Sequence, residues 1–335
     1  MTDAIGPRPD IVELVWRARE RDHAEAPRSY LGASAVGAEC ERQLWYTFRH
    51  VGREQFPGRV LRLFETGHLE ERRFVKDLES IGIEVQDEDP MTGRQWAYSA
   101  FGGHGRGHGD GVARGVPGFP ESEWLLVEMK THNGRSFARL EAHGVMESKP
   151  QHYAQMQLYM HLGGYRHALY VAKNKDNDDL YVETIPYHAE HAAALMSRWE
   201  GIIFAEEPPP KINDNPAIPP CKWCALRDHC HGAEPALVNC RTCAHARPER
   251  DGSWSCQAGH RYGVATCSHH QYHPGLVPLS RAERILDDGT IEYRAQNGRR
   301  FLNGPSGMNS EQIQSQQPWS QTDDKPKRKR RAWDR

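Results

Sequence analysis

Apolar residues recur at helical spacing in some parts of the chain and in short or alternating runs in others. The helical spacing predicts helices at residues 9–24, 42–50, 60–78, 150–163 and 187–205. The short runs predict strands at residues 83–85, 95–101, 111–114, 124–130, 167–173 and 180–185. Because both kinds of element share one stretch of chain, we expect an α/β core with a central mixed β-sheet flanked by helices.

The pattern changes after residue 205. Proline-rich sequence at 208–220 predicts an extended linker, and one strand pair is expected at 290–294 and 300–302. Glutamine, serine, proline and basic residues from 304 onward predict disorder, with the run Lys327–Arg331 a weak phosphate contact at most. The predicted divisions are 1–29, a helical segment; 30–232, the core; 238–303, a small C-terminal module; and 304–335, a disordered basic tail.

The composition excludes few classes of protein. The chain has 335 residues, of which 38% are hydrophobic and 26% charged, as in ordinary globular proteins. No run is long enough for a membrane helix, so we expect no membrane partner, and the first residues lack a secretory signal. We therefore expect a cytoplasmic protein with reduced thiols. A formal net charge of −2 gives no evidence for nucleic acid by itself.

Candidate chemistry lies at the end of the apolar run 124–127. Glu128 and Lys130 follow it, and strand alternation places both side chains on one face. Asp110 starts its own short strand after a glycine-rich run. Asp110, Glu128 and the carbonyl of Met129 are suitable Mg²⁺ ligands, and Lys130 could orient a water molecule. Cleavage of a phosphodiester needs this chemistry, although Glu-x-Lys alone is usually a surface ion pair.

These segments, with Gly67–Glu71 and Gln155–Tyr159, resemble the RecB-like exonuclease branch of the PD-(D/E)XK nuclease superfamily over roughly residues 30–232. The resemblance implies a restriction-endonuclease-like core that uses Mg²⁺ or Mn²⁺. It also implies that Glu71 assists the metal, with Glu70 as the neighbouring candidate, since many relatives have histidine there. Gln155 and Tyr159 would lie at the active site on the DNA side. His104 and His108 are expected in a flexible loop, with at most a weak role for His108.

The resemblance implies an Mg²⁺-dependent DNA exonuclease that acts on single- or double-stranded DNA ends. Its setting would be recombination or repair in a phage or prophage, with a single-strand annealing protein or a helicase as further partner. A structure-specific or single-strand endonuclease with the same site is the first alternative. A non-catalytic, metal-stapled DNA-binding or scaffold protein is the second, and the intact set of Asp110, Glu128 and Lys130 argues against it.

Eight cysteines suggest metal binding in a reducing compartment, because seven of them lie between residues 221 and 267. Cys221, Cys224 and Cys230 form one compact group, and Cys40 stands alone far upstream. This split resembles the iron–sulfur RecB-like nucleases, which implies a structural [4Fe–4S] cluster on these four cysteines. Zn²⁺ in the same ligands stays open, as does Cys40 as a small buried residue.

The other four cysteines predict a zinc-ribbon-like module. Cys240, Cys243, Cys256 and Cys267 have the spacing of a Zn²⁺ site, and so polar a segment needs a staple to fold. A nearby histidine could replace one thiolate, the candidates being His260, His269 and His270. The complete expectation is therefore an α/β core followed by a small metal-stapled C-terminal module.

Overall fold

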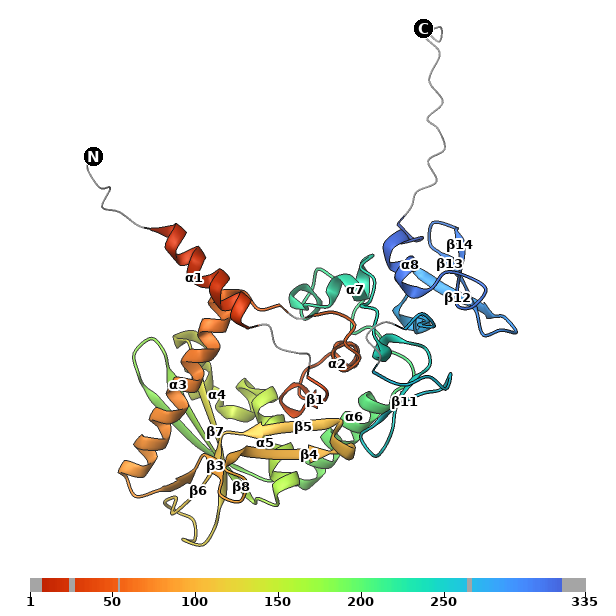
Figure 1. Ribbon diagram of the computed structural model, residues 1–335. Helices are drawn as coiled ribbons and strands as arrows, with labels where there is room; N and C mark the ends of the chain where they lie inside the picture. Colours follow the sequence, from red (N-terminus) through yellow and green to blue (C-terminus); the bar gives the residue numbers. More distant parts are fainter. Residues whose placement is uncertain (1–7, 24–27, 54, 264–266, 321–335) are drawn as a thin grey trace, which may run out of the picture. The chain divides into compact units, whose positions relative to one another are not determined.

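The computed structural model describes residues 8–23, 28–53, 55–263 and 267–320 (Figure 1). Its contacts divide the chain into two compact units. The first comprises Met1–Phe48, Arg53–Ala205 and Pro248–Ser253, and the second Arg49–Gly52, Glu206–Arg247 and Trp254–Arg335. The division after Ala205 differs from the predicted boundary near residue 232, because residues 206–232 have their contacts in the second unit.

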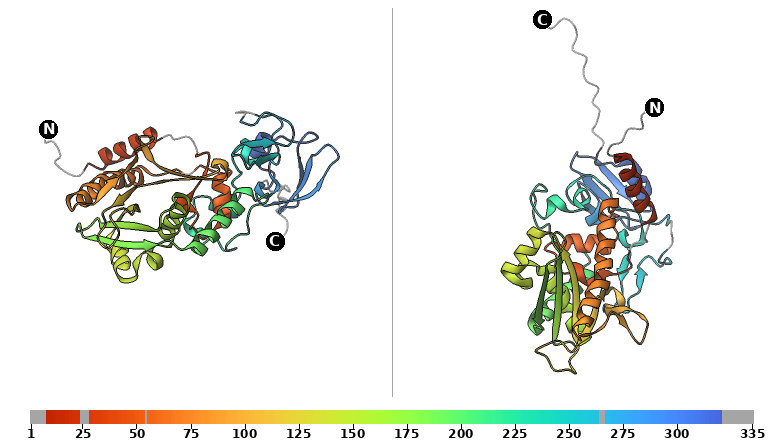
Figure 2. Two further views of the ribbon diagram at one scale, coloured as in Figure 1. Left: turned by 90° about the horizontal axis from the view of Figure 1, so that it is seen from below. Right: turned by 90° about the vertical axis from the view of Figure 1, so that its left-hand side faces the viewer.

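A five-stranded sheet forms the centre of the first unit. Its order is β2-β6-β7-β8-β9, with β7 and β8 parallel and every other neighbouring pair antiparallel. The strands are β2 (Glu84–Gln86), β6 (Gly111–Arg114), β7 (Leu125–His132), β8 (His167–Asn174) and β9 (Leu180–Pro186). The predicted α/β class with a central mixed sheet is confirmed, since helices cover both faces of this sheet (Figure 2).

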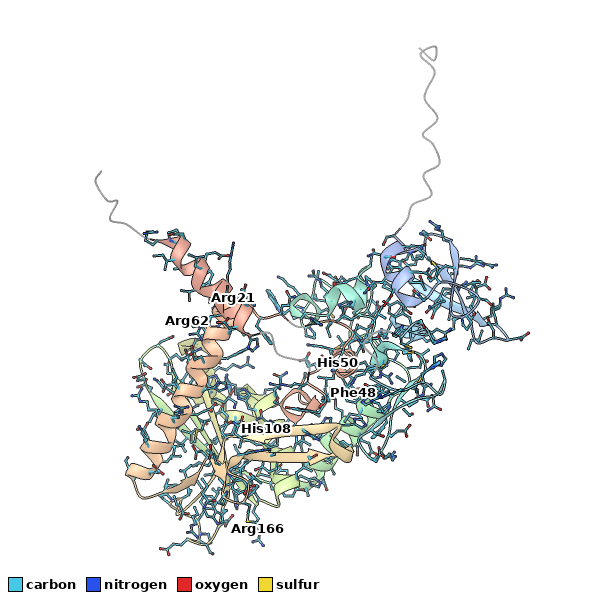
Figure 3. All side chains as sticks on the ribbon, viewed as in Figure 1. Arg21, Phe48, His50, Arg62, His108 and Arg166 are labelled. Atoms are coloured by element: carbon cyan, nitrogen blue, oxygen red, sulfur yellow. The ribbon has the colours of Figure 1, made fainter. Side chains whose placement is uncertain are left out.

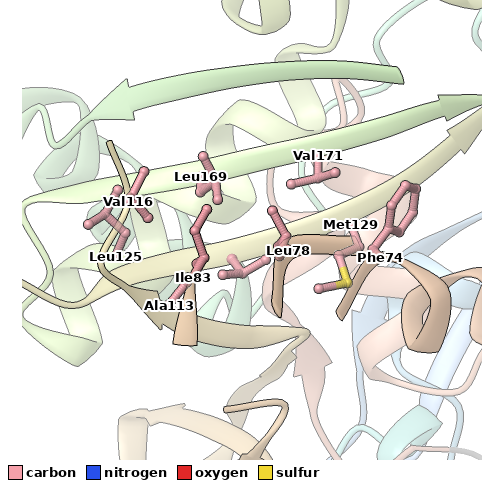
Figure 4. Close-up of a cluster of buried hydrophobic side chains, with 10 residues drawn as sticks. Phe74, Leu78, Ile83, Ala113, Val116, Leu125, Met129, Leu169 and Val171 are labelled. Atoms are coloured by element: carbon pink, nitrogen blue, oxygen red, sulfur yellow. The ribbon is translucent and has the colours of Figure 1, made fainter. Parts of the chain in front are cut away.

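Helix α3 (Gly58–Ser80) packs on one face of the sheet. Its Phe74 and Leu78 join Val127 and Met129 of β7 in a buried apolar cluster (Figure 4). Successive side chains of a strand point to opposite faces, so Glu128 and Lys130 point away from this cluster. Helices α4 (Gly134–Ser148) and α5 (Pro150–Gly163) contact the sheet from that other side.

Helix α4 is absent from the sequence prediction. It starts at Asn133, whose side chain accepts a hydrogen bond from the Ser136 N–H at 2.9 Å. Gly144 interrupts it with a φ of 68°. The helix buries Phe137, Leu140 and Val145.

A second sheet in the first unit contains a strand in which three of five residues are glycine. Its order is β1-β5-β4-β3. The strands are β1 (Leu31–Gly32), β3 (Glu88–Asp89), β4 (Arg94–Ala100) and β5 (Gly105–Gly109). The expectation of a flexible loop is wrong for this segment, which forms strand β5. Its glycines alternate with Arg106 and His108, and only the glycines are buried.

The glycines of β5 are explained by a layer of aromatic rings beneath them. A Cβ atom on Gly107 would lie 2.3 Å from Tyr159 Oη, and one on Gly105 would lie 2.7 Å from Trp199 Cζ2. Tyr159 in turn stacks on Tyr98 with ring centroids 4.7 Å apart. The strand can pack this closely only because these positions lack side chains.

The remaining elements of the first unit frame these two sheets. Helix α6 packs on α5 and α2, and α1 packs on α3. The elements are α1 (Pro9–Asp22), the 3-10 helix η1 (Ala33–Ala35), α2 (Glu41–Phe48), the 3-10 helix η2 (Phe101–Gly103) and α6 (Ala189–Phe204).

The second unit consists of short elements and a three-stranded sheet. Its short pieces are η3 (Cys221–Trp223), α7 (Arg227–His231), η4 (Cys240–Thr242), β10 (Ala246–Pro248), β11 (Trp254–Cys256) and η5 (Pro274–Leu276). The sheet is antiparallel, with strands β12 (Ser280–Ile285), β13 (Ile291–Ala295) and β14 (Arg300–Asn303). The last two are the predicted pair, whereas β12 is almost wholly solvent-exposed and lacks the apolar alternation that would reveal it.

The prediction of disorder from residue 304 is wrong for residues 304–320. Helix α8 (Ser310–Gln316) begins at a capping box between Asn309 and Gln312. Ile313 and Trp319 are buried. These two apolar side chains anchor an otherwise polar segment, and the composition of the segment concealed them. The predicted basic run Lys327–Arg331 lies outside the described residues.

Within the described ranges, no helix is both long enough and apolar enough to span a membrane.

We predict that Gly107→Ala destabilises the first unit. The added methyl group would collide with the buried, stacked ring of Tyr159, and overpacking of this kind costs about 1–3 kcal/mol. Gly67→Ala is the matched control, because no atom lies within 4 Å of its Cβ position in α3, and it should raise stability by up to about 1 kcal/mol. Denaturant titration of the full chain measures both. Equal stability of the two variants would contradict the packing argument.

Candidate metal and catalytic centre

Asp110 is held against the backbone of the neighbouring strand. It immediately precedes β6, whose Gly111 pairs with Val127 of β7. Two residues further along β7, the Met129 N–H donates to Asp110 Oδ2 at 2.7 Å. The Asp110 side chain is 13% exposed. The end of a short strand thus fixes one carboxylate beside the end of the predicted catalytic strand.

Glu128 and Lys130 complete the centre. The Lys130 ammonium forms an ion pair with Glu128 Oε1, and it lies 3.4 Å from Asp110 Oδ2 and 3.1 Å from the Met129 carbonyl oxygen. Glu128 is completely buried, whereas the Lys130 side chain is 27% exposed. The structure therefore brings together Asp110, Glu128, Met129 and Lys130 as predicted, with the lysine at the open side.

Electrostatics distinguish the two charged partners on β7. Burial raises the pKa of Glu128 to about 8, although Lys130 opposes this shift. Burial acts against the charge on Lys130, but the carboxylates of Glu128 and Asp110 outweigh it and raise the pKa of the lysine. The lysine consequently remains a cation at every physiological pH, and the proton that can be exchanged near neutrality belongs to Glu128.

Helix α3 contributes Glu71 and not Glu70. Burial raises the pKa of Glu71, and the nearby Asp110 raises it further, while His68 and Lys130 lower it. Glu70 instead accepts a hydrogen bond from Lys173 at 2.9 Å. Adjacent helical residues point in different directions, so only Glu71 faces the centre. Its role as a metal ligand stays a prediction.

Gln155 and Tyr159 occupy different layers of the site. The Gln155 amide donates to Glu128 Oε2 at 3.0 Å and so fixes the orientation of this carboxylate. Tyr159 lies beneath Gly107 and is almost completely buried. This place favours support of β5 over direct contact with DNA, and the predicted contact with DNA stays untested.

A polar network next to Lys130 has no counterpart in the sequence prediction. The Tyr170 hydroxyl lies 2.9 Å from His132 Nε2 and 2.9 Å from His152 Nδ1. Burial is the main cause that lowers the pKa of His132 to about 4 and that of His152 to about 3, so both rings are neutral. His132 continues the alternation of Glu128 and Lys130 along β7, a signal that the sequence did contain.

The two histidines of the glycine-rich segment behave differently. His104 is buried, and its Nε2 lies 2.9 Å from the Glu249 carbonyl oxygen and 3.1 Å from that of Ser253. The expectation of a flexible loop residue is therefore wrong for His104, which joins two chain segments of the first unit. His108 is exposed on β5, two residues before Asp110.

The residues of the centre fit a hard divalent cation. Glu128 Oε1 is buried and makes no hydrogen bond within the described residues, its partner of opposite charge being the Lys130 ammonium. No three His, Cys, Asp or Glu side chains among the described residues are close enough to hold a metal by themselves. This does not exclude Mg²⁺, which proteins bind with one or two carboxylates plus water and substrate phosphates.

The first predicted cysteine set falls on both units. Cys40 belongs to the first unit and accepts a hydrogen bond from the Gln43 N–H at 3.4 Å, at the start of α2. Cys221, Cys224 and Cys230 belong to the second, where the Cys224 N–H donates to the Cys221 carbonyl at 3.1 Å. The tight turn of Cys221–Cys224 suits a metal-binding knuckle, and the shared cluster stays a prediction.

The second cysteine set lies in the second unit, where three of its thiols influence one another electrostatically. Burial raises the pKa of the Cys243 thiol, and nearby Cys256 and Cys267 raise it further. Cys240 accepts a hydrogen bond from the Gly263 N–H at 3.3 Å. The four thiols do not stand at metal-binding distances in the described structure, so zinc at this set stays a prediction.

Comparison with known proteins gives only distant structural likeness. No family model and no curated protein matches the chain. The crystal structure of SSO0001 is 14% identical and matches with a TM-score of 0.38 over 65% of this chain and 94% of that one. An alkaline exonuclease from Laribacter hongkongensis, LHK-Exo, is 16% identical and matches with a TM-score of 0.35 over 57% of this chain and 90% of that one. Its complex with dAMP matches equally well.

We predict that metal binding weakens as the pH falls below about 8. A cation must displace the proton on Glu128, so the affinity for Mn²⁺ should fall by up to about tenfold per pH unit below that value and level off above it. The raised pKa also means that the metal-free protein loses stability as the pH rises from about 4.5 towards 8. Calorimetry in buffers of different ionisation enthalpy counts the released proton. Glu128→Gln should release none, and a pH-independent affinity would refute the assignment.

We predict that neighbouring carboxylates of α3 differ in their effect on the metal. Glu71→Gln removes a negative charge that faces Asp110 and should weaken Mn²⁺ binding by about tenfold. Glu70→Gln removes pairings with Lys173 and Arg73 and should change the affinity by less than about twofold. Titration of Mn²⁺ followed by electron paramagnetic resonance compares the two. A larger loss of Mn²⁺ affinity in Glu70→Gln than in Glu71→Gln would contradict the assignment of Glu71 to the site.

Proposed function

We propose that the protein is a divalent-metal-dependent deoxyribonuclease of the RecB-like PD-(D/E)XK type. One observation carries this proposal: Asp110, Glu128 and Lys130 converge at the paired ends of β6 and β7 in a mixed sheet. A surface ion pair would leave Glu128 exposed. Here the carboxylate is fully buried and additionally held by Gln155.

The side chains of the centre divide the work of phosphodiester hydrolysis. Bound Mg²⁺ or Mn²⁺ would supply Lewis-acid stabilisation of charge on the phosphate. Asp110, Glu128 and the Met129 carbonyl are the residues that would hold it. Lys130 is the only one of these groups with a positive charge and substantial exposure, so it would position the attacking water and stabilise negative charge as it develops. Gln155 keeps the Glu128 carboxylate in one orientation.

The finer assignment is an exonuclease that acts on DNA ends. It rests on the sequence resemblance, as does the setting in phage recombination or repair with an annealing protein or helicase as partner. A structure-specific or single-strand endonuclease would use the same residues. Topology of the DNA substrate separates the two, because only an endonuclease cuts a closed circle.

The cysteines extend the proposal to structural metals. We infer a [4Fe–4S] cluster on Cys40, Cys221, Cys224 and Cys230, supported by the knuckle-like turn at Cys221–Cys224. We infer Zn²⁺ on Cys240, Cys243, Cys256 and Cys267, supported by the approach of three of these thiols. Both metals would act as structural staples.

We predict that Lys130→Ala abolishes cleavage of end-labelled linear DNA in Mg²⁺ or Mn²⁺. Loss of one group that stabilises the transition state lowers the rate by at least about a hundredfold. Lys130→Met serves as a second variant, because it fills the space of the lysine stem without its charge. Lys76→Met is the matched control: this lysine is exposed on α3, and its replacement should leave the rate unchanged.

Closed circular DNA in the same assay tests the finer assignment. Resistance of the circle supports an exonuclease, and its cleavage would establish the endonuclease alternative. Absence of cleavage by the unmodified protein, or unchanged cleavage in folded Lys130→Ala and Lys130→Met, would refute the proposed mechanism. Circular dichroism establishes that the variants are folded.

A further inference from the structure

Strand β5 presents a positively charged face that leads to the candidate centre. Its buried glycines face the aromatic layer, so Arg106 and His108 project from the opposite face and are exposed. Alternate residues of a strand lie about 6.7 Å apart, close to the spacing of successive phosphates in an extended single strand. Counting on by two from His108 reaches Asp110, directly beyond the strand. Figure 3 marks His108 on this strand.

An aromatic ring lies between these two basic side chains. The Arg106 guanidinium carbon is 6.0 Å from the ring centroid of Tyr30, and the Tyr30 and His108 ring centroids are 6.5 Å apart at an interplanar angle of 64°. Tyr30 is only partly buried. We call Tyr30, Arg106 and His108 the entry row. A ring flanked by basic groups and open to solvent can stack a nucleobase.

A second guanidinium extends the positive charge. In the parallel pairing of β1 and β5, Gly32 lies opposite Arg106. Arg28 Nη1 lies 4.0 Å from the position that a Cβ on Gly32 would take. Because Gly32 is a glycine, no side chain projects from this position between Arg28 and Arg106.

The charge of the entry row is not balanced by acidic neighbours. Within the described residues, no carboxylate forms an ion pair with Arg106 or His108. Three other arginines of this chain, in contrast, are balanced: Arg114 pairs with Glu84 at 2.7 Å, and Arg294 and Arg300 both pair with Glu283. Unbalanced positive charge beside a polar catalytic centre fits a polyanion better than it fits a solvated surface.

We propose that the entry row binds a single strand of DNA and guides it to Asp110. Stacking on Tyr30 requires a base that is not already stacked in a duplex, so the row selects single-stranded substrate or the frayed end of a duplex. This inference rests on the proposed nuclease function and names the substrate form for the same site. Arg106 and His108 would contact phosphates, and Tyr30 would contact a base.

The test measures DNA binding and cleavage separately. Full-length protein carrying Lys130→Ala, which cannot cut, is titrated with a fluorescein-labelled single-stranded oligonucleotide and with the same sequence as a blunt duplex, followed by anisotropy. Arg106→Gln and Tyr30→Leu should each raise the Kd for the single strand by about tenfold and change that for the duplex much less. Arg106→Gln should also lower the slope of log affinity against log salt by about 0.7.

Two control variants make the result specific. Arg166→Gln removes the same charge from an exposed arginine of the first unit that Figure 3 shows well away from His108, and it should change the Kd by less than about twofold. Tyr30→Phe keeps the stacking ring and should bind like the parent. The proposal for the entry row would be refuted by equal losses of affinity in Arg106→Gln and Arg166→Gln. Equal losses of affinity for the single strand and the duplex would also refute it.

The outcomes also separate this inference from the proposed function. Suppose that protein with intact Lys130 cuts DNA while the entry-row variants bind the single strand normally. The proposal that the entry row binds a single strand is then wrong, and the proposed nuclease function is supported. Suppose instead that protein with intact Lys130 cuts no DNA while Arg106→Gln and Tyr30→Leu still lose affinity for the single strand. Binding by the entry row is then supported, and the proposed nuclease function is wrong. Thermal melting of Tyr30→Leu beside Tyr30→Phe shows whether a loss reflects misfolding.

Discussion

The buried charge of Glu128 is the constraint on which the rest of the centre depends. An ionised carboxylate without solvent contact costs several kcal/mol unless an opposite charge and hydrogen bonds compensate it. Lys130 supplies the charge from the same strand, and Gln155 supplies the hydrogen bond from α5. The compensation is incomplete, since Glu128 still holds a raised pKa. This residual deficit, which an ordinary ion pair lacks, is the feature on which the proposed metal site rests.

A second constraint comes from the aromatic layer under β5. Tyr98 and Tyr159 stack within the first unit, and β5 can cross them only with glycine at the contacting positions. Asp110 directly follows this strand and accepts the hydrogen bond of the Met129 N–H. The same packing also forces the remaining side chains of β5 to the outer face. The glycines thus help to position the candidate carboxylate of Asp110 and leave Arg106 exposed.

Sequence reasoning succeeded where one strand or helix carried the signal alone. The apolar run before Glu128 and the period-two placement of Lys130 were sufficient to predict β7 and its polar end. Strand β5 could not be predicted, because glycine disfavours strands and its partner rings lie far away in the sequence. The resemblance already preferred Glu71 to Glu70, and the structure adds that Glu70 is engaged by Lys173 of β8. Neither the sequence nor the fold shows the cysteines in a metal-binding arrangement, because their bonding depends on a metal.

Charge at the centre connects the metal to the substrate. Three carboxylates and one ammonium leave two negative charges when all are ionised, and one divalent cation neutralises them. Two carboxylate ligands satisfy only part of the oxygen shell that Mg²⁺ requires, and the remainder must come from water and phosphate. An entering phosphate, however, brings negative charge to a site that is already neutral. The charge of Lys130 is already counted in that balance, so tight binding of a polyanion requires further positive charge along its approach, where Arg106 of β5 presents it.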